Sequence, residues 1–213
     1  MGILNMPNLD FLIVEFDKGL RTLFGSPAGG RPSPGLAVPA TELSSDEKSS
    51  VAALMRVNHC GEICAQALYQ GQALVARTEP TRELLLKAAQ EECDHLDWCQ
   101  QRLDDLGGSR SVLNPLWYAG SFGLGVASGM LGDKWSMAFL VETERQVERH
   151  LDNHLTRLPE SDIKSRKVLE AMRDDEIRHG DSGEQHGAAP MPQAVKLAMR
   201  IVSRLMTRIA YWV

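Results

Sequence analysis

The sequence carries one pattern twice: a glutamate on an apolar helical stripe, followed by Glu-x-x-His on a second stripe. The two glutamates lie 30 and 32 residues apart in the two copies, which consist of Glu62, Glu92 and His95, and of Glu144, Glu176 and His179. Residues three apart face the same side of a helix, and the other positions of these stripes are mostly Leu, Met, Ala and Val. A buried carboxylate beside a buried imidazole is costly unless a cation neutralises them. The pattern therefore predicts four helices packed around a divalent metal centre.

The donor atoms indicate which metal this centre would hold. One glutamate from each of two helices, with Glu-x-x-His from each of two others, is the general di-iron or di-manganese carboxylate site of helical bundles. Oxygen-rich ligands with two imidazoles suit iron or manganese better than structural zinc. The alternative is a set of solvated ion pairs, which the apolar stripes disfavour. The predicted metal ligands are Glu62, Glu92, His95, Glu144, Glu176 and His179.

Several neighbouring residues are candidates for supporting roles. Glu148 lies one turn beyond Glu144 and competes with it as a ligand. Glu91 and Asp175 each precede a predicted ligand, so each acid is placed to orient the histidine of the opposite hairpin, the alternative being a solvated acid. We expect His150 and His154 to be surface or supporting groups, and the pattern leaves His59 and His186 undecided.

Capping residues and helix breakers divide the chain into helices. Ser44 with Glu47 forms a capping box, Gly107 is a suitable C-cap, and Ser161 is the expected cap of the last bundle helix. No stretch alternates apolar and polar residues as a strand does. Short links within each hairpin and a long connection at about 107–133 predict an all-α, ferritin-like four-helix bundle with a long crossover between its second and third helices.

The chain is thus expected to have four parts. They are an amphipathic N-terminal helix at 1–24, a linker at 25–43, the ferritin-like di-iron bundle at 44–190, and a basic amphipathic helix at 191–213. The linker prediction rests on four prolines and four glycines within residues 25–41, which neither a helix nor a central strand tolerates.

Three segments predict contact with a membrane. Residues 194–213 carry Lys or Arg at every fourth position from 196 to 208, on an otherwise apolar helix that ends in Tyr211 and Trp212. This composition is typical of a helix in a bilayer interface, the alternative being a fifth core helix. Residues 112–131 carry no charge, and we interpret them as the crossover, which either packs on protein or dips into lipid. With the N-terminal helix, these segments favour peripheral attachment over a transmembrane span.

Composition excludes other classes of protein. A net charge of −5 and 6% aromatic residues argue against nucleic acid as a partner. The four cysteines form no C-x-x-C pair and are expected to be buried thiols in a reducing compartment. Asp10, Glu15 and Asp17 interrupt the first apolar stretch, which predicts neither a secretory signal nor a transit peptide. A bacterial-type chain on the cytoplasmic side of the cell inner membrane is therefore expected.

Four segments resemble the demethoxyubiquinone hydroxylases, the membrane-associated di-iron enzymes of ubiquinone biosynthesis. They are RVNHCGEICAQALYQGQ, EECDHLDWC, VETERQVERHLDNHL and RDDEIRHGDSGEQHGA. The resemblance covers about residues 45–213, and the 25–41 linker is not part of it. It implies a ferritin-like fold and assigns the iron ligands of the family to the same six residues.

The resemblance also implies the chemistry. Two iron ions per chain would use O2 to hydroxylate the ring of a polyprenyl demethoxyquinol at its last unsubstituted carbon. The implied partners are this quinol, the membrane surface and other proteins of ubiquinone biosynthesis. Because no G-x-G-x-x-G follows a strand and no flavin signature occurs, electrons from NADH would arrive only through the quinone or a partner.

Three alternatives remain open at the level of sequence. The first is a ferritin-like ferroxidase or iron store, which would not need the basic C-terminal helix. The second is a membrane-bound di-iron quinol oxidase, which would reduce oxygen to water without hydroxylating a product. The third is a helical membrane scaffold, which would purify without metal.

Overall fold

The computed structural model describes residues 9–25, 29–39 and 41–213. Parts of the predicted N-terminal helix and linker, at 1–8, 26–28 and 40, lie outside this range. The described chain contains seven helices and no strand, as the all-α prediction requires. The helices are α1 (Leu9–Phe24), α2 (Ser45–Val75), α3 (Glu79–Leu106), α4 (Asn114–Met130), α5 (Asp133–Arg157), α6 (Ile163–Gln185) and α7 (Gln193–Ala210).

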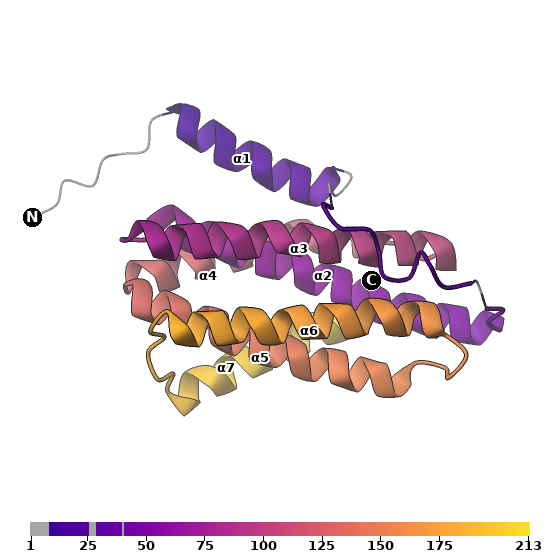
Figure 1. Ribbon diagram of the computed structural model, residues 1–213. Helices are drawn as coiled ribbons and strands as arrows, with labels where there is room; N and C mark the ends of the chain where they lie inside the picture. The colour runs from indigo at the N-terminus through magenta and orange to yellow at the C-terminus, as the bar shows by residue number, and fades with distance from the viewer. Residues whose placement is uncertain (1–8, 26–28, 40) are drawn as a thin grey trace, which may run out of the picture.

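Two helical hairpins form the bundle. Helices α2 and α3 make one hairpin and α5 and α6 make the other, and the four run alongside one another in Figure 1. Their apolar stripes form two core clusters, one including Met55 and the other including Tyr69. Glu62 lies between these two residues on α2, so the polar centre is enclosed by apolar packing on both sides along the bundle.

Local hydrogen bonds explain where the bundle helices begin and end. Ser44 Oγ accepts from the backbone N–H of Glu47 at 3.3 Å, and the Glu47 carboxylate accepts from Ser44 N–H at 2.8 Å. The predicted capping box is therefore confirmed, as is Gly107, which adopts φ 69° at the end of α3. The prediction for Ser161 is wrong, because Asp162 caps α6. Its carboxylate accepts from Ser165 N–H and also binds Arg102 of α3, an ion pair that a serine cannot form.

The long crossover contains a helix of its own. Helix α4 packs against α2 with glycines at the closest contacts. A Cβ atom on Gly125 would lie 2.2 Å from the Leu68 carbonyl oxygen, and one on Gly71 would lie 2.4 Å from that of Phe122. Gly125 of α4 and Gly71 of α2 thus let the two backbones approach. The prediction of a long crossover is confirmed, with a packed helix as its main part.

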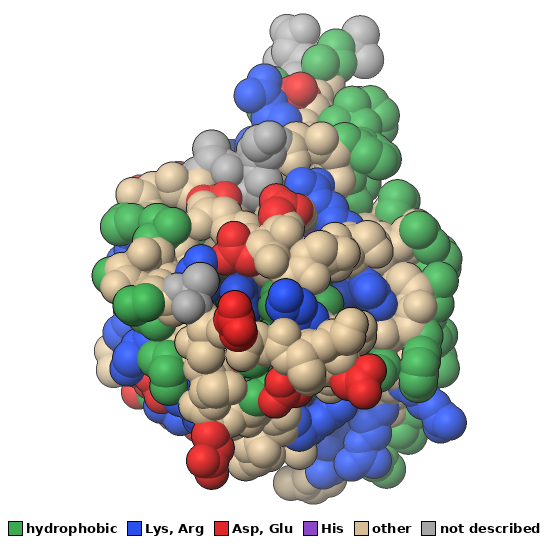
Figure 2. Space-filling model, turned by 90° about the vertical axis from the view of Figure 1, so that its right-hand side faces the viewer, with side chains coloured by type: hydrophobic (Ala, Val, Ile, Leu, Met, Phe, Trp, Pro, Cys, Tyr) green, Lys and Arg blue, Asp and Glu red, His purple; other side chains and the backbone are tan. Residues whose placement is uncertain are grey.

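Hydrophobic side chains remain exposed on the helices outside the bundle. They include Phe16 of α1, Leu116 and Leu124 of α4, and Ile201 and Leu205 of α7. Figure 2, which views the molecule end-on, shows hydrophobic side chains on the projecting α1 and in a band down one edge. Helix α7 docks on α2 and α5 along one side only, and of its side chains only Ala210 is fully buried. Among the described helices, none combines the length and apolar character that a membrane crossing needs.

Candidate metal centre

The six predicted ligands converge in the middle of the bundle. They form two groups whose ligand atoms lie within 4.8 Å of one another, all of them buried. One group contains Glu62 and His95, the other contains Glu144 and His179, and both include Glu92 and Glu176. Two metal positions that share two carboxylates are therefore what the arrangement offers.

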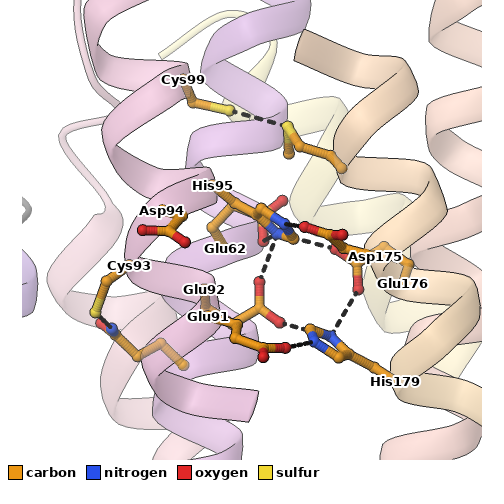
Figure 3. A network of polar contacts seen from close by, with 12 residues as sticks. Glu62, Glu91, Glu92, Cys93, Asp94, His95, Cys99, Asp175, Glu176 and His179 are labelled. Atoms are coloured by element: carbon orange, nitrogen blue, oxygen red, sulfur yellow. Dashed lines mark hydrogen bonds and ion pairs between the residues drawn. The ribbon is translucent and has the colours of Figure 1, made fainter. Parts of the chain in front are cut away.

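Each histidine turns the same ring nitrogen toward the carboxylates. Nδ1 of His95 lies 3.0 Å from Glu92, 3.3 Å from Glu176 and 3.7 Å from Glu62. Nδ1 of His179 lies 3.4 Å from Glu92, 3.5 Å from Glu144 and 3.7 Å from Glu176. Figure 3 shows the two imidazoles on either side of Glu92. The internal repeat of the sequence is thus repeated in space.

The opposite ring nitrogen of each histidine binds an outer acid. Nε2 of His95 lies 2.9 Å from Asp175, and Nε2 of His179 lies 2.5 Å from Glu91 (Figure 3). Each acid belongs to the hairpin opposite its histidine, as predicted. Such a contact fixes the ring orientation and keeps the proton on Nε2, which leaves Nδ1 free to bind a metal.

The charges of the cluster fit two divalent cations. Four carboxylates carry four negative charges when ionised, and two divalent ions balance them. Within the described residues, one oxygen each of Glu92, Glu144 and Glu176 has no hydrogen-bond partner, nor does His179 Nδ1. Burial raises the pKa of Glu62 and of Glu144 well above the ordinary value, because without a cation the enclosed charge is unfavourable. Buried ligand atoms without a hydrogen-bond partner are expected of a metal site.

Tyr69 is a member of the site that the sequence pattern did not single out. Its hydroxyl donates to Oε1 of Glu144 at 2.5 Å, and both side chains are fully buried. The sequence signal for it is its place on the same apolar stripe as Glu62. A tyrosine buried there is expected to need a hydrogen-bond partner for its hydroxyl group.

The remaining candidates lie outside the two groups. Glu148 is partly exposed and pairs with Arg145 at 3.5 Å. His154 Nδ1 contacts Asn58 at 2.7 Å, and burial lowers its pKa to about 3. Burial, helped by the positive charge of Arg110, lowers the pKa of His59 to about 3, whereas His186 is exposed beside the Ser182 carbonyl.

Two cavities reach the centre from different directions. An apolar cavity of about 310 Å³ is bordered by Glu62 and lies between α2, α4, α5 and α7. A more polar cavity of about 340 Å³ is bordered by Glu91 and His179, with Lys87, Arg178 and His186 around it. The two cavities thus border the same cluster on different sides.

Fold and site together define an all-α bundle protein with a buried carboxylate and histidine centre suited to two divalent metal ions. Comparison with known families identifies the family to which the chain belongs. The profile of the family described as ubiquinone biosynthesis protein COQ7 matches residues 49–210, and the chain belongs to that family.

Two relatives of similar length share one name. The protein of Dechloromonas aromatica is 54% identical over 202 residues, which are 95% of this chain and 98% of that protein. The protein of Nitrosospira multiformis is 55% identical over 208 residues, which are 98% of this chain and 100% of the relative. Both are named 3-demethoxyubiquinol 3-hydroxylase. The family expected from the sequence motifs is confirmed.

Proposed function

We propose that the chain is a di-iron monooxygenase that hydroxylates the ring of a polyprenyl demethoxyquinol, acting as a 3-demethoxyubiquinol 3-hydroxylase. The observation that carries this proposal is the pair of buried residue groups that could hold metal ions, in a chain 54–55% identical to relatives of that name. The reaction inserts one atom of O2 into a ring C–H bond. The second oxygen atom leaves as water, which consumes two electrons and two protons.

We assign the ligands by their positions in the cluster. Glu62 with His95 would hold one iron ion, Glu144 with His179 would hold the other, and both ions would share two carboxylates, those of Glu92 and Glu176. When bound, a pair of iron(II) ions supplies two electrons and open coordination positions for O2. Asp175 and Glu91 hold the imidazoles in the orientation that this requires.

The apolar cavity is our candidate quinol site. Its wall includes Leu68, Phe139 and Met199, which would pack against the ring and the start of the polyprenyl chain. Ser121 and Thr143 also border it and offer hydroxyl groups to the oxygen substituents of the ring. A ring bound here lies beside Glu62 and is kept from bulk water by α4 and α7.

The exposed apolar side chains support peripheral binding to a membrane. A polyprenyl quinol resides in lipid, and the quinol cavity lies between α4 and α7, which both expose leucines. Arg200, Arg204 and Arg208 are exposed on α7 and would face lipid phosphates, whereas Lys196 pairs with Glu142 of α5 at 3.1 Å. We therefore assign the chain to the cytoplasmic surface of the cell inner membrane. Electrons would come from NADH through the quinone or through a partner of the ubiquinone pathway.

A single-turnover experiment tests this function. The iron-loaded protein is reduced without air, mixed with demethoxyubiquinol in detergent, and exposed to isotopically labelled O2. We expect one labelled oxygen atom in the quinone ring by mass spectrometry. Oxygen consumed with the quinone mass unchanged would contradict the hydroxylase and favour a quinol oxidase or a ferroxidase.

A further inference from the structure

The segment between α1 and α2 is bound to the bundle beside the metal centre. Residues 29–39, which we call the strap, run as irregular chain along the bundle (Figure 1) and precede the matched family region. The backbone N–H groups of Gly30 and Arg31 donate to Asp94 Oδ1 at 2.5 and 3.1 Å. The indole of Trp98 donates to the Arg31 carbonyl oxygen at 3.1 Å. The strap is therefore anchored on α3, one residue away from His95.

Glycines allow the strap to lie this close. A Cβ atom on Gly29 would lie 2.9 Å from a carboxylate oxygen of Asp97 on α3. A Cβ atom on Gly35 would lie 2.9 Å from Cγ of Lys164 on α6. The strap thus crosses from one helical hairpin to the other. The glycines that prevent it from forming a helix allow it to pack closely on both hairpins.

The guanidinium of Arg31 joins the two hairpins at the centre. Its Nε donates to Asp94 Oδ2 on α3 at 2.5 Å, and its Nη2 donates to Asp175 Oδ2 on α6 at 2.6 Å. The same guanidinium lies 4.8 Å from the ring centroid of Trp98, which in turn packs against His95. A planar guanidinium fixes two acceptors in one geometry, which a lysine cannot do.

Asp175 connects Arg31 to a predicted metal ligand. Its Oδ2 atom accepts from Arg31 and is also the atom that lies 2.9 Å from His95 Nε2. Its other oxygen is bound by Arg178. With both oxygens held, the carboxylate cannot rotate away from the imidazole.

Within the described residues, the acid behind the other histidine is not held by two arginines. Glu91, the acid behind His179, has a side chain that is 25% exposed. Apart from His179, its ion-pair partner among the described residues is Lys87 of its own helix, at 3.7 Å. The Asp175 side chain is 8% exposed and is held by a residue 144 positions away in the sequence. The two halves of the centre therefore differ in how firmly their imidazoles are fixed.

We propose that Arg31 is a positioning residue for the metal centre, which holds Asp175 against His95 and thereby makes the Glu62–His95 position the tighter of the two metal sites. This inference rests on the ligand set given under the proposed function. It assigns a role to a segment outside the matched family region.

The test is iron(II) titration of the full chain under anaerobic conditions, with chelator competition and Mössbauer spectroscopy to follow the two sites. We expect Arg31→Met to weaken one site by about 10- to 100-fold, the usual effect of losing a partner that supports a ligand, and to leave the other site unchanged. Arg31→Lys should restore part of the affinity. In an Asp175→Asn background, Arg31→Met should cause no further loss, because the two residues act through one contact.

Arg102→Met is the matched control. Arg102 also joins the two hairpins, through Asp162 and Ser165, but lies outside the two metal-binding groups. Its loss should lower the unfolding temperature and leave the difference between the two iron sites intact.

Three results would overturn the inference alone. They are unchanged iron affinity in Arg31→Met, an equal loss at both sites, and a loss that simply adds to that of Asp175→Asn. A chain that binds no iron would overturn the inference together with the ligand set. Selective weakening in a protein that binds two irons yet hydroxylates nothing would support the inference while contradicting the proposed function.

Discussion

Tyr69 donates its hydroxyl hydrogen to Oε1 of Glu144 across 2.5 Å, from α2 to α5. Oε1 also lies 3.5 Å from Nδ1 of His179, and the second oxygen of Glu144 has no hydrogen-bond partner within the described residues. Tyr69 thus fixes the carboxylate with one oxygen occupied and the other available to a metal ion.

Tyr69→Phe should therefore affect both the fold and the centre. Loss of a buried hydrogen bond to a carboxylate is expected to destabilise the metal-free protein by about 1–3 kcal/mol. Iron at the Glu144 position should bind about 10- to 100-fold more weakly, because the carboxylate can rotate. Thermal unfolding and iron titration measure the two effects. Tyr118→Phe is the control, since Tyr118 donates to Gln70 outside the centre and should affect stability alone.

Glu144→Ala and Glu148→Ala separate the two rival ligands of α5. Glu144 is fully buried in the cluster, whereas Glu148 is partly exposed beside Arg145. We expect Glu144→Ala to lose iron and hydroxylation while circular dichroism stays helical. Glu148→Ala should keep both iron ions, because a surface ion pair contributes at most about 1 kcal/mol. The reverse outcome would move the ligand to Glu148.

Stability should depend on pH in opposite ways with and without metal. In the metal-free chain, Glu92 and the other acids around the histidines outweigh burial and raise the pKa of His95 and of His179 above the ordinary 6.5. The folded state then keeps protons that the unfolded state releases above pH 6.5. This stabilisation is complete below that pH and is lost above it, by up to about 1.4 kcal/mol per pH unit for each imidazole.

The burial-raised pKa values of Glu62 and Glu144 act in the same direction. Metal ions require deprotonated ligands, so iron binding should strengthen as the pH rises. We expect the unfolding temperature of the metal-free protein to fall between pH 6.5 and about pH 8.5, and that of the iron-loaded protein to rise or stay level. A metal-free protein that becomes more stable over this range would show that the imidazoles are not charged in the fold.

Gly61→Phe tests the apolar cavity as the quinol site. Gly61 borders this cavity beside Glu62, and a Cβ atom there meets nothing within 4 Å. The phenyl ring should fill the cavity without straining the helix, because glycine is the less favourable residue inside a helix. We expect full iron content with at least a tenfold loss of demethoxyubiquinol hydroxylation, about the 1.4 kcal/mol that a blocked apolar contact is worth.

Gly123→Phe is the matched control for this variant. Gly123 is an exposed glycine of α4, with open space at its Cβ and no place in the cavity wall. Hydroxylation should persist in Gly123→Phe. Equal activity of the two variants would exclude this cavity as the route to the centre.

Glutamate substitutions at exposed apolar positions of α7 should release the protein from membranes. Ile201 and Leu205 are 58% and 57% exposed. Burying two such side chains in lipid contributes about 3–6 kcal/mol, so Ile201→Glu with Leu205→Glu should weaken binding to anionic vesicles by at least about 100-fold. Leu86→Glu with Ile163→Glu changes two exposed apolar residues of α3 and α6 as a control. Equal weakening by both pairs would contradict a membrane-facing α7.

Sequence spacing predicted the parts of this structure that repeat along a helix. It placed Glu62 and the other five ligand candidates on one seam, because helical periodicity fixes which side chains share a face. It also anticipated Asp175 and Glu91, since each adjoins a ligand. In contrast, the contact of Tyr69 with Glu144 spans 75 residues and depends on how two helices face each other.

Composition predicted that the strap lacks regular structure and that residues 112–131 lack charge, but it did not predict how either segment packs. Four glycines and four prolines predicted that residues 25–41 avoid regular structure, but not that Arg31 binds Asp94 and Asp175. The glycines of residues 112–131 diluted the apolar character of the predicted crossover. Their function becomes visible only at the contact of Gly125 with Leu68, where the lack of a side chain permits close packing.

The most direct test of the central claim is anomalous diffraction at the iron edge from crystals of the iron-loaded chain. The account predicts two peaks in the bundle core, one beside Glu62 and His95 and the other beside Glu144 and His179, with Glu92 and Glu176 between them. Iron peaks outside this cluster, or a single peak that engages only one histidine, would contradict it.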